Sequence, residues 1–294
     1  MVIYDPKDWL SFILHFHKAD TVKKLFPAIV AIAVYSASVV WLETEWIRVG
    51  KGDKLNNVSI LQSMLGFVIS MLLVFRTNTA YERWWEGRKL WGALVNSSRY
   101  LAIKLHPVLD AMHEQERHFF AHMIPNYAFA LKNHLRKKTI YDEFTEQQLL
   151  HGSLNDTHHV PNRIARMIYE RINRLYNSGV VKNEQLLTLS TEVQQFSEIC
   201  GGCERIKNTP IPFSYSSFIK KFIFFYIITL PWGYVYSTGY FIVPIVVFVF
   251  YVLASLELIA EEIEDPFGTD ANDLPTDDIS QNIRSSVTEI LGKL

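Results

Sequence analysis

Three long stretches of the chain carry no charged side chain. They are Leu25–Leu42, Leu55–Phe75 and Phe222–Leu256, with 18, 21 and 35 residues. An α-helix needs about 20 mainly apolar residues to cross the ~30 Å hydrocarbon layer of a bilayer. Each of the first two stretches is therefore suited to one crossing. Because three such stretches would demand an unusually large soluble core, we interpret them as membrane helices and not as buried core helices.

The third stretch is too long for one crossing. As a single helix it would extend ~52 Å at 1.5 Å per residue. Four helix-breaking residues interrupt it, namely Pro231, Gly233, Gly239 and Pro244. We therefore expect a hairpin of two spans, and place the four crossings at approximately 25–43, 56–78, 216–236 and 240–262.

The rest of the chain is predicted to be helical and polar. No proline occurs between Leu55 and His106, so the second span can continue beyond the membrane as one long helix. Farther along, Ile164, Ile168, Ile172 and Leu175 recur at helical spacing. No alternating β-strand pattern and no internal repeat are found. The expected fold is all-α: a single unit over residues 1–294, with a cytoplasmic helical region at about 79–212 and 263–294.

Basic residues beside the spans predict the orientation. Residues 76–104 hold six Lys and Arg against two acidic residues, and 204–221 hold four against one, whereas 43–57 are balanced. Because Lys and Arg are retained on the cytoplasmic side, both termini and the middle third are expected in the cytoplasm. The overall net charge of −1 provides no attraction to nucleic acid, which is not an expected partner.

Few residues suggest catalytic chemistry. Cys200 and Cys203 have redox or metal-ligand spacing, but a second cysteine pair and a preceding strand are both missing from the sequence pattern. We interpret this segment as small residues at a crowded helix end. His118 and His122 share a helix face without an obvious third ligand. No phosphate loop or nucleophile elbow is found, so an enzyme is not expected.

The second span carries an apolar stripe. Phe67, Met71 and Phe75 follow each other four residues apart, and Ser63, Gly66 and Ser70 flank them. Small residues allow membrane helices to approach closely. The stripe fits ordinary helix packing. Alternatively, several copies around an axis would form rings of bulky apolar side chains, and such a constriction can gate ions by excluding water.

Three motifs resemble the bestrophin family, and more closely its bacterial branch. They are "FRTNTAYERWWEGRKLWG", "GCERIKNTPIPFSYS" and "EEIEDPFGTDANDLP". The resemblance covers almost the whole chain in the same order. It implies a homopentamer of four-span, all-helical subunits in the lipid bilayer of the cell (inner) membrane. Its implied activity is an ion channel that passes small inorganic ions, chloride and similar anions foremost, through a central pore.

The resemblance also assigns pore positions. It places the hydrophobic neck, or gate, at Phe67, Met71 and Phe75. It places a second, cytoplasmic aperture near Glu184, through a less distinctive alignment and where relatives commonly have an apolar residue. Five carboxylates at that aperture would favour cations. Selectivity for anions or for monovalent cations therefore stays open.

The acidic stretch Glu261–Asp278 has two interpretations. In animal bestrophins the corresponding segment forms a calcium clasp, which by resemblance would place Asp270 and Asp273 as side-chain ligands and Glu262 and Asp265 as backbone ligands. Calcium takes six to eight oxygens, so carbonyls and water would complete such a site. In this chain Ala271 and Asn272 dilute the acids. We favour a strap held by ionic contacts with basic cytoplasmic helices.

Two other functional classes stay open beside the channel. One is a membrane-embedded thiol-redox enzyme that uses Cys200 and Cys203, and the other is a structural membrane protein that conducts no ions. Glu257, Glu261 and Glu264 share a face at the inner end of the fourth span, with Arg76, Arg83 and Arg88 as expected partners. The gating stimulus and the role of the C-terminal tail are not predicted by the sequence.

Overall fold

The computed structural model describes residues 20–47, 56–138, 141–145 and 159–292, and every regular element in these ranges is a helix. The chain divides into two compact units. The apolar unit comprises Val2–Glu82 and Pro210–Glu264, and the polar unit comprises Arg83–Thr209 and Asp265–Leu294. The long helix α3 (Asn56–Leu105) contributes residues to both. The expectation of one cooperative unit over residues 1–294 stays a prediction, because compactness does not measure cooperativity.

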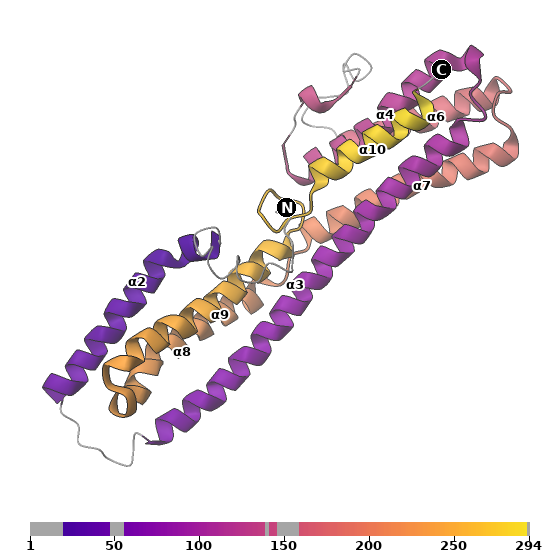
Figure 1. The fold of residues 1–294 in the computed structure, drawn as a ribbon. Coiled ribbons are helices and arrows are strands. Elements are labelled where there is room, and N and C mark those ends of the chain that lie inside the picture. Colours follow the sequence, from indigo (N-terminus) through magenta and orange to yellow (C-terminus); the bar gives the residue numbers. More distant parts are fainter. Residues whose placement is uncertain (1–19, 48–55, 139–140, 146–158, 293–294) are drawn as a thin grey trace. The chain divides into compact units, whose positions relative to one another are not determined.

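The apolar unit is made of α2 (Asp20–Trp41), the π-helical turn η2 (Leu42–Ile47), the first half of α3, α8 (Phe213–Thr238), the 3₁₀ turn η5 (Gly239–Phe241) and α9 (Ile242–Glu264). Helices α8 and α9 lie side by side, and α2 packs along α9 (Figure 1). The buried core between them includes Val40, Ile69, Leu73, Ile223, Ile227 and Val246. Among the residues that the structure describes, three segments are long and apolar enough to cross a membrane, namely Thr21–Trp46, Ser59–Leu105 and Phe213–Glu264.

The hairpin in the third apolar segment turns at Gly239. This residue ends α8 with a φ angle of +55°, a conformation that glycine adopts without steric cost. Pro231, one of the expected breakers, instead lies buried inside α8. The apolar segment therefore forms two helices, α8 and α9, as expected, and their bounds exceed the predicted 216–236 and 240–262 by two to three residues at most ends.

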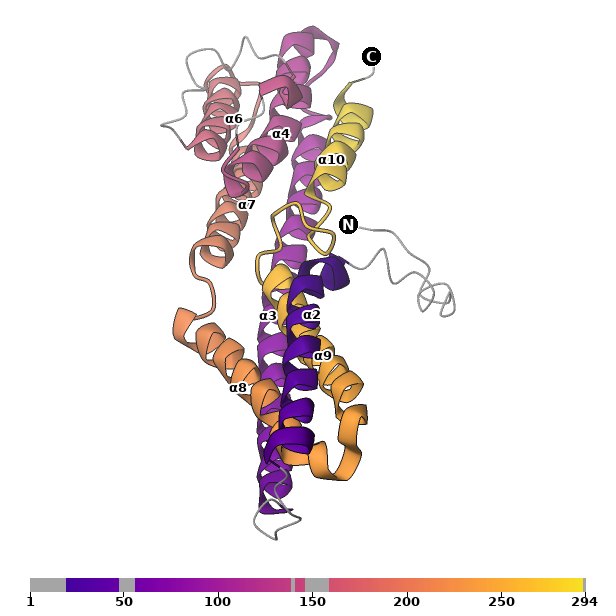
Figure 2. The same ribbon diagram turned by 90° about the vertical axis from the view of Figure 1, so that its left-hand side faces the viewer.

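The polar unit combines the second half of α3 with η3 (Ala111–His113), α4 (Glu114–Leu135), η4 (Tyr141–Glu143), α6 (Val160–Asn177), α7 (Asn183–Asn208) and α10 (Thr276–Leu291). Helix α4 packs against α10 and α6, and α6 against α7 (Figure 2). The core includes Trp91, Leu94, Phe120, Tyr127, Phe196, Ile283 and Val287. The C-terminal segment whose role the sequence left open is thus a helix packed on α4.

Helix α6 illustrates how local sequence produces these elements. The His159 side chain caps its N-terminus by accepting a hydrogen bond from the Asn162 amide, and Pro161 occupies the first turn. Ile164, Ile168, Ile172 and Leu175 are all buried, so the periodicity seen in the sequence is confirmed as the packed face. Gly179, with a φ angle of +78°, follows the helix.

The interpretation of the Cys200–Cys203 segment as a helix end is wrong. Helix α7 continues through both glycines and ends at Asn208. A Cβ atom on Gly202 would stand 3.0 Å from side-chain carbons of Leu90 on α3. The glycine therefore serves a close approach of two helices, and the helix remains continuous because packing outweighs the low helix propensity of glycine.

Candidate pore-lining site

The predicted neck residues lie on one exposed face of α3. Phe67, Met71 and Phe75 are 67%, 46% and 57% exposed, respectively. They span eight residues of unbroken helix, which is ~12 Å at 1.5 Å per residue. The three apolar side chains of the stripe therefore do not contribute to the core of the apolar unit.

The opposite face of α3 is the packed one. Ile69, Leu73 and Arg76 are buried at 1–2% exposure. Phe67 and Met71 each stand two residues from Ile69, which is about 200° around a helix with 3.6 residues per turn. Gly66 faces α8, where an added Cβ would come within 2.7 Å of the Tyr226 hydroxyl oxygen. The expectation that a small residue permits close helix approach is confirmed at this position.

A charge cluster anchors α3 to α9 just beyond the stripe. The Arg76 guanidinium is 2.7 Å from Glu264 and 3.5 Å from Glu257, with Arg76 and Glu257 both buried. The second Glu264 oxygen accepts a hydrogen bond from the Ile211 amide at 2.6 Å. The predicted role of Arg76 as a partner of these glutamates is confirmed, and the cluster fixes the rotation of α3 about its own axis.

Two further ion pairs in the apolar unit involve lysines that the sequence analysis did not single out. Lys220 on α8 is 2.9 Å from Glu261, and Lys24 on α2 is 2.8 Å from Glu262. Both lysines lie in the N-terminal halves of their helices, far from the glutamates in sequence. Only the packing of α2, α8 and α9 brings them together, so no local pattern could have found them.

Glu184 lies in the first turn of α7 and is exposed. The helix begins with a capping interaction, in which the Lys182 amide donates a hydrogen bond to the Gln185 side chain at 2.8 Å. Three residues on, Leu187 is 71% exposed. The position of Glu184 at a solvent-facing helix end is compatible with an aperture, and its assignment to one stays a prediction.

The four acidic residues expected at the calcium site make other side-chain contacts or are exposed. Glu262 pairs with Lys24, and Asp265 pairs with Lys207. Asp273 is buried, and its Oδ2 accepts a hydrogen bond from the Asp270 amide at 2.6 Å, whereas Asp270 itself is exposed. The two lysines contact the side chains of Glu262 and Asp265, whereas the resemblance assigns their backbone carbonyls to calcium, so these ion pairs do not test that assignment. The calcium site at these residues stays a prediction.

The strap interpretation of the same stretch is supported by several contacts in the polar unit. Lys207 of α7 pairs with Asp265, and Asp277 contacts Lys132 of α4 and Arg136 at its C-cap at 2.8 Å each. The Leu274 amide donates to the Pro266 carbonyl at 2.9 Å, which closes the intervening loop. These ionic contacts join the segment after α9 to basic helices, as the sequence analysis favoured.

The two cysteines are poorly suited to redox chemistry. Both are buried in the core of the polar unit and are not joined by a disulfide. Burial, reinforced by the charge of Glu204, raises the pKa of the Cys200 thiol to about 12. Because the thiolate is the reactive form, the thiol is inert at neutral pH. The geometry thus disfavours a thiol-redox enzyme.

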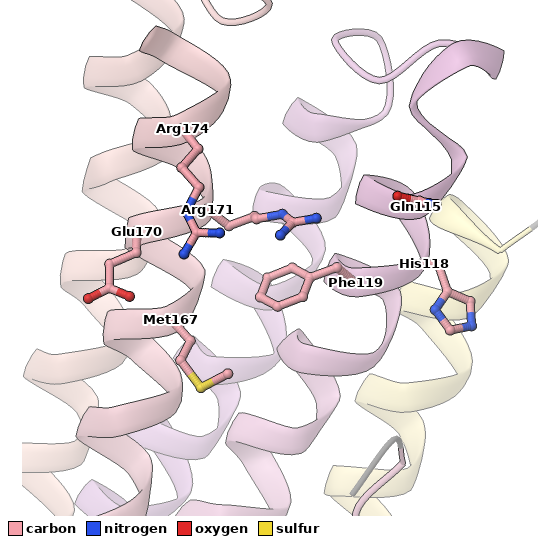
Figure 3. A pocket seen from close by; sticks show the side chains of 7 residues that line it. All are labelled: Gln115, His118, Phe119, Met167, Glu170, Arg171 and Arg174. Atoms are coloured by element: carbon pink, nitrogen blue, oxygen red, sulfur yellow. The ribbon is translucent and has the colours of Figure 1, made fainter. Parts of the chain in front are cut away.

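His118, with His122 close by on α4, lines a cavity of about 380 Å³ between α4 and α6 (Figure 3). Arg171 in that cavity pairs with Glu116 and lies 5.1 Å from the centre of the Phe119 ring. Glu170 is 3.5 Å from Arg166. The cavity holds acidic and basic groups together, which matches the expectation of a solvated helix surface.

The amino-acid sequence matches a known family over nearly its whole length. A family model described as bacterial/fungal bestrophin protein matches residues 1–289. The chain belongs to the bestrophin family. A variant of the bacterial bestrophin homolog from Klebsiella pneumoniae has a similar structure, with a TM-score of 0.82 and 26% identity, over 92% of this chain and 100% of that one. The all-α, bestrophin-like fold predicted from the sequence is thereby confirmed.

Relatives of this bestrophin include two proteins named voltage-dependent anion channel-forming protein. The one from Synechocystis sp. is 30% identical, over 97% of this chain and 92% of its own length. The one from Escherichia coli (strain K12) is also 30% identical, over 99% of this chain and 94% of its own. This bestrophin is a membrane protein, since its family and its long apolar helices agree.

Proposed function

We propose that this bestrophin is the subunit of a homopentameric ion channel that conducts chloride and similar small anions. The single observation that carries the proposal is the exposure of Phe67, Met71 and Phe75 on the face of α3 opposite its buried face. The relatives named anion channel-forming proteins support the activity and the class of ion. Five copies of the stripe around an axis form a narrow apolar neck, which gates conduction by excluding water.

The subunit crosses the inner membrane four times, with both termini in the cytoplasm. The crossings are α2, the first half of α3, α8 and α9, of which α8 and α9 form the hairpin that turns at Gly239. Orientation is supported by the excess of Lys and Arg in 76–104 and 204–221. The polar unit then lies on the cytoplasmic side, and Glu184 lines its aperture.

A channel for monovalent cations is the second candidate. The observation that favours it is the exposed carboxylate of Glu184, because a ring of five such groups attracts cations and repels anions. We rank the anion channel first, since the relatives are named for anions. The non-conducting structural protein and the thiol-redox enzyme rank below both, the latter because Cys200 and Cys203 are buried.

Current recording across a planar bilayer tests the proposal. The purified protein is reconstituted between asymmetric KCl solutions, and the reversal potential is measured. An anion channel gives a reversal potential near the chloride equilibrium potential. A value near the potassium equilibrium potential establishes the cation channel instead, and a bilayer that shows no current at any voltage, although the protein is incorporated, contradicts both.

A further inference from the structure

Three side chains of the polar unit converge from three different helices. His134 lies in the last turn of α4, His159 precedes α6 as its N-cap, and Glu204 lies on α7. The Nε2 atoms of both histidines are 2.7 Å from the same Glu204 oxygen, Oε1. The two imidazole centroids are 4.3 Å apart. Within the described part of the chain, this is the cluster whose ligand atoms are close enough to hold one metal ion.

We propose that His134, His159 and Glu204 form a binding site for a zinc ion. Two imidazoles and one carboxylate are a ligand set that Zn²⁺ accepts in its open sites, with water in the fourth position. Ligands of a tetrahedral zinc ion stand about 3.3 Å from one another at zinc–ligand bonds of about 2.0–2.1 Å. The present separations of 2.7 Å therefore need to widen by only about half an ångström.

The environment of the cluster suits an exchangeable ion. The three side chains are 30–33% exposed, so they are neither fully hydrated nor sealed in the core. Glu204 also lines a cavity of about 630 Å³ between α6 and α7. That cavity gives an ion a path from solvent and leaves room for its water ligand.

Zinc binding changes which ring nitrogen of each histidine carries the proton. Without metal, Glu204 accepts hydrogen bonds from the Nε2–H groups of both rings, and His159 Nδ1 accepts from the Asn162 amide at 3.2 Å. With metal, each Nε2 presents its lone pair to zinc and the proton moves to Nδ1. His159 then can no longer accept from Asn162, so zinc binding competes with the N-cap of α6.

The double role of His159, as zinc ligand and as N-cap, suggests a variant that removes one role and keeps the other. Asparagine is among the best N-cap residues, so His159→Asn removes the zinc ligand and keeps a side chain that caps α6. His134→Gln and Glu204→Gln remove the other two ligands with little change of volume. The control is the double variant His118→Gln/His122→Gln, because these two histidines lie together on α4, with ring nitrogens 3.1 Å apart, and are not part of the proposed site.

The experiment is calorimetric titration of ZnCl₂ into the full-length oligomer in detergent, after treatment with a chelator. We expect one zinc ion per chain in the wild type and in the control. We expect each ligand variant to bind at least about tenfold more weakly, since even changes behind the ligands cost that much. Thermal unfolding with and without zinc is the second readout, because a ligand that binds only the folded state raises Tm.

The outcomes separate cleanly. Zinc that raises Tm of the wild type and the control but not of His159→Asn supports the site. The site is contradicted if the wild-type protein binds no zinc in the titration. It is also contradicted if His159→Asn binds zinc with wild-type affinity, or if the His118→Gln/His122→Gln control loses zinc binding. If His134→Gln or Glu204→Gln fails to fold, His159→Asn decides alone, and its unchanged Tm without zinc shows that it is folded. None of these results depends on ion conduction.

Discussion

Phe67, Met71 and Phe75 combine large apolar side chains with high exposure in the single subunit. Exposure in the single subunit alone does not distinguish a stripe that faces lipid from one that faces a pore, since both kinds of stripe are exposed there. What distinguishes these residues is their place opposite the packed face of the helix that also carries the buried Arg76 cluster. Rotation of α3 is therefore fixed within the apolar unit, and with it the direction of the stripe.

Glu184→Gln tests the charge of the proposed aperture. Neutralising five carboxylates removes a field that attracts cations, so the reversal potential in asymmetric KCl should move toward the chloride equilibrium potential. Glu198→Gln is the matched control, because Glu198 is also exposed on α7 and pairs there with Gln194 and Gln195. Equal reversal potentials for wild type, Glu184→Gln and Glu198→Gln would remove Glu184 from the conduction path.

Arg76→Leu tests the buried charge cluster. The substitution leaves the Glu257 and Glu264 carboxylates without their cation in a mostly apolar setting, and breaking a buried ion pair in this way typically costs about 3–5 kcal/mol. Thermal unfolding in detergent should show a large loss of stability. Arg88→Leu, at an exposed position of the same helix, should have little effect. Equal Tm values for the two variants would contradict the anchoring role of Arg76.

At the scale of elements, helix α10 depends on ionic contacts with α4. Burial raises the pKa of Asp277, but hydrogen bonds from Arg136 and Lys132 outweigh that effect and hold the pKa at about 2. A carboxyl group with a lowered pKa in the folded state stabilises the protein above its ordinary pKa near 3.8, and the contribution is lost as the pH falls toward 2. The same contacts satisfy Lys132, which is buried at 1% exposure.

Asp277→Asn should therefore destabilise the polar unit at neutral pH. Because the side chain is 55% exposed, solvent screening limits the expected loss of stability to about 1 kcal/mol. Chemical unfolding at pH 7 and near pH 3 measures it: the difference from wild type should shrink at the lower pH. Asp278→Asn, at the next and exposed position, serves as the control. A pH-independent difference would contradict the ionic mechanism.

The elements show what the sequence could predict. Long apolar runs and the periodic Ile164–Leu175 face predicted helices correctly, because local composition and burial agree there. Pro231 was expected to break a helix and does not, since buried packing in α8 compensates for the lost hydrogen bond. The cysteine segment does not end its helix for a similar reason: Gly202 allows a close contact with Leu90 on another helix, which the local sequence does not reveal.

Candidate sites were predictable only where residues are close in sequence or family motifs carry them. The stripe on α3 is a local pattern, and Arg76 was found because the fourth span ends in glutamates. The pairing of Lys24 with Glu262 and the convergence of His134, His159 and Glu204 depend on how separate helices pack. No spacing in the sequence encodes these contacts, so they appear only in the folded structure.

At the scale of the whole molecule, the chain is a bestrophin, and we propose how its copies assemble into a channel. Membership in the bestrophin family follows from a match over residues 1–289 and from the similarity to a solved bacterial homolog. The pentamer, the neck and the direction of the ion path are proposals that make sense of an exposed apolar stripe. They agree with one another, because only a closed ring of subunits converts one stripe per chain into a narrow constriction.

The most direct test of the neck is chemical modification of Phe67→Cys during current recording in a bilayer. The native thiols interfere little, because Cys200 and Cys203 are buried and burial raises the pKa of Cys200 to about 12. The matched control is Phe225→Cys, at an exposed phenylalanine of α8. A charged, water-soluble methanethiosulfonate reagent should block the current of Phe67→Cys and leave that of Phe225→Cys unchanged. Unaltered current in a Phe67→Cys channel shown by mass spectrometry to be modified would contradict the neck.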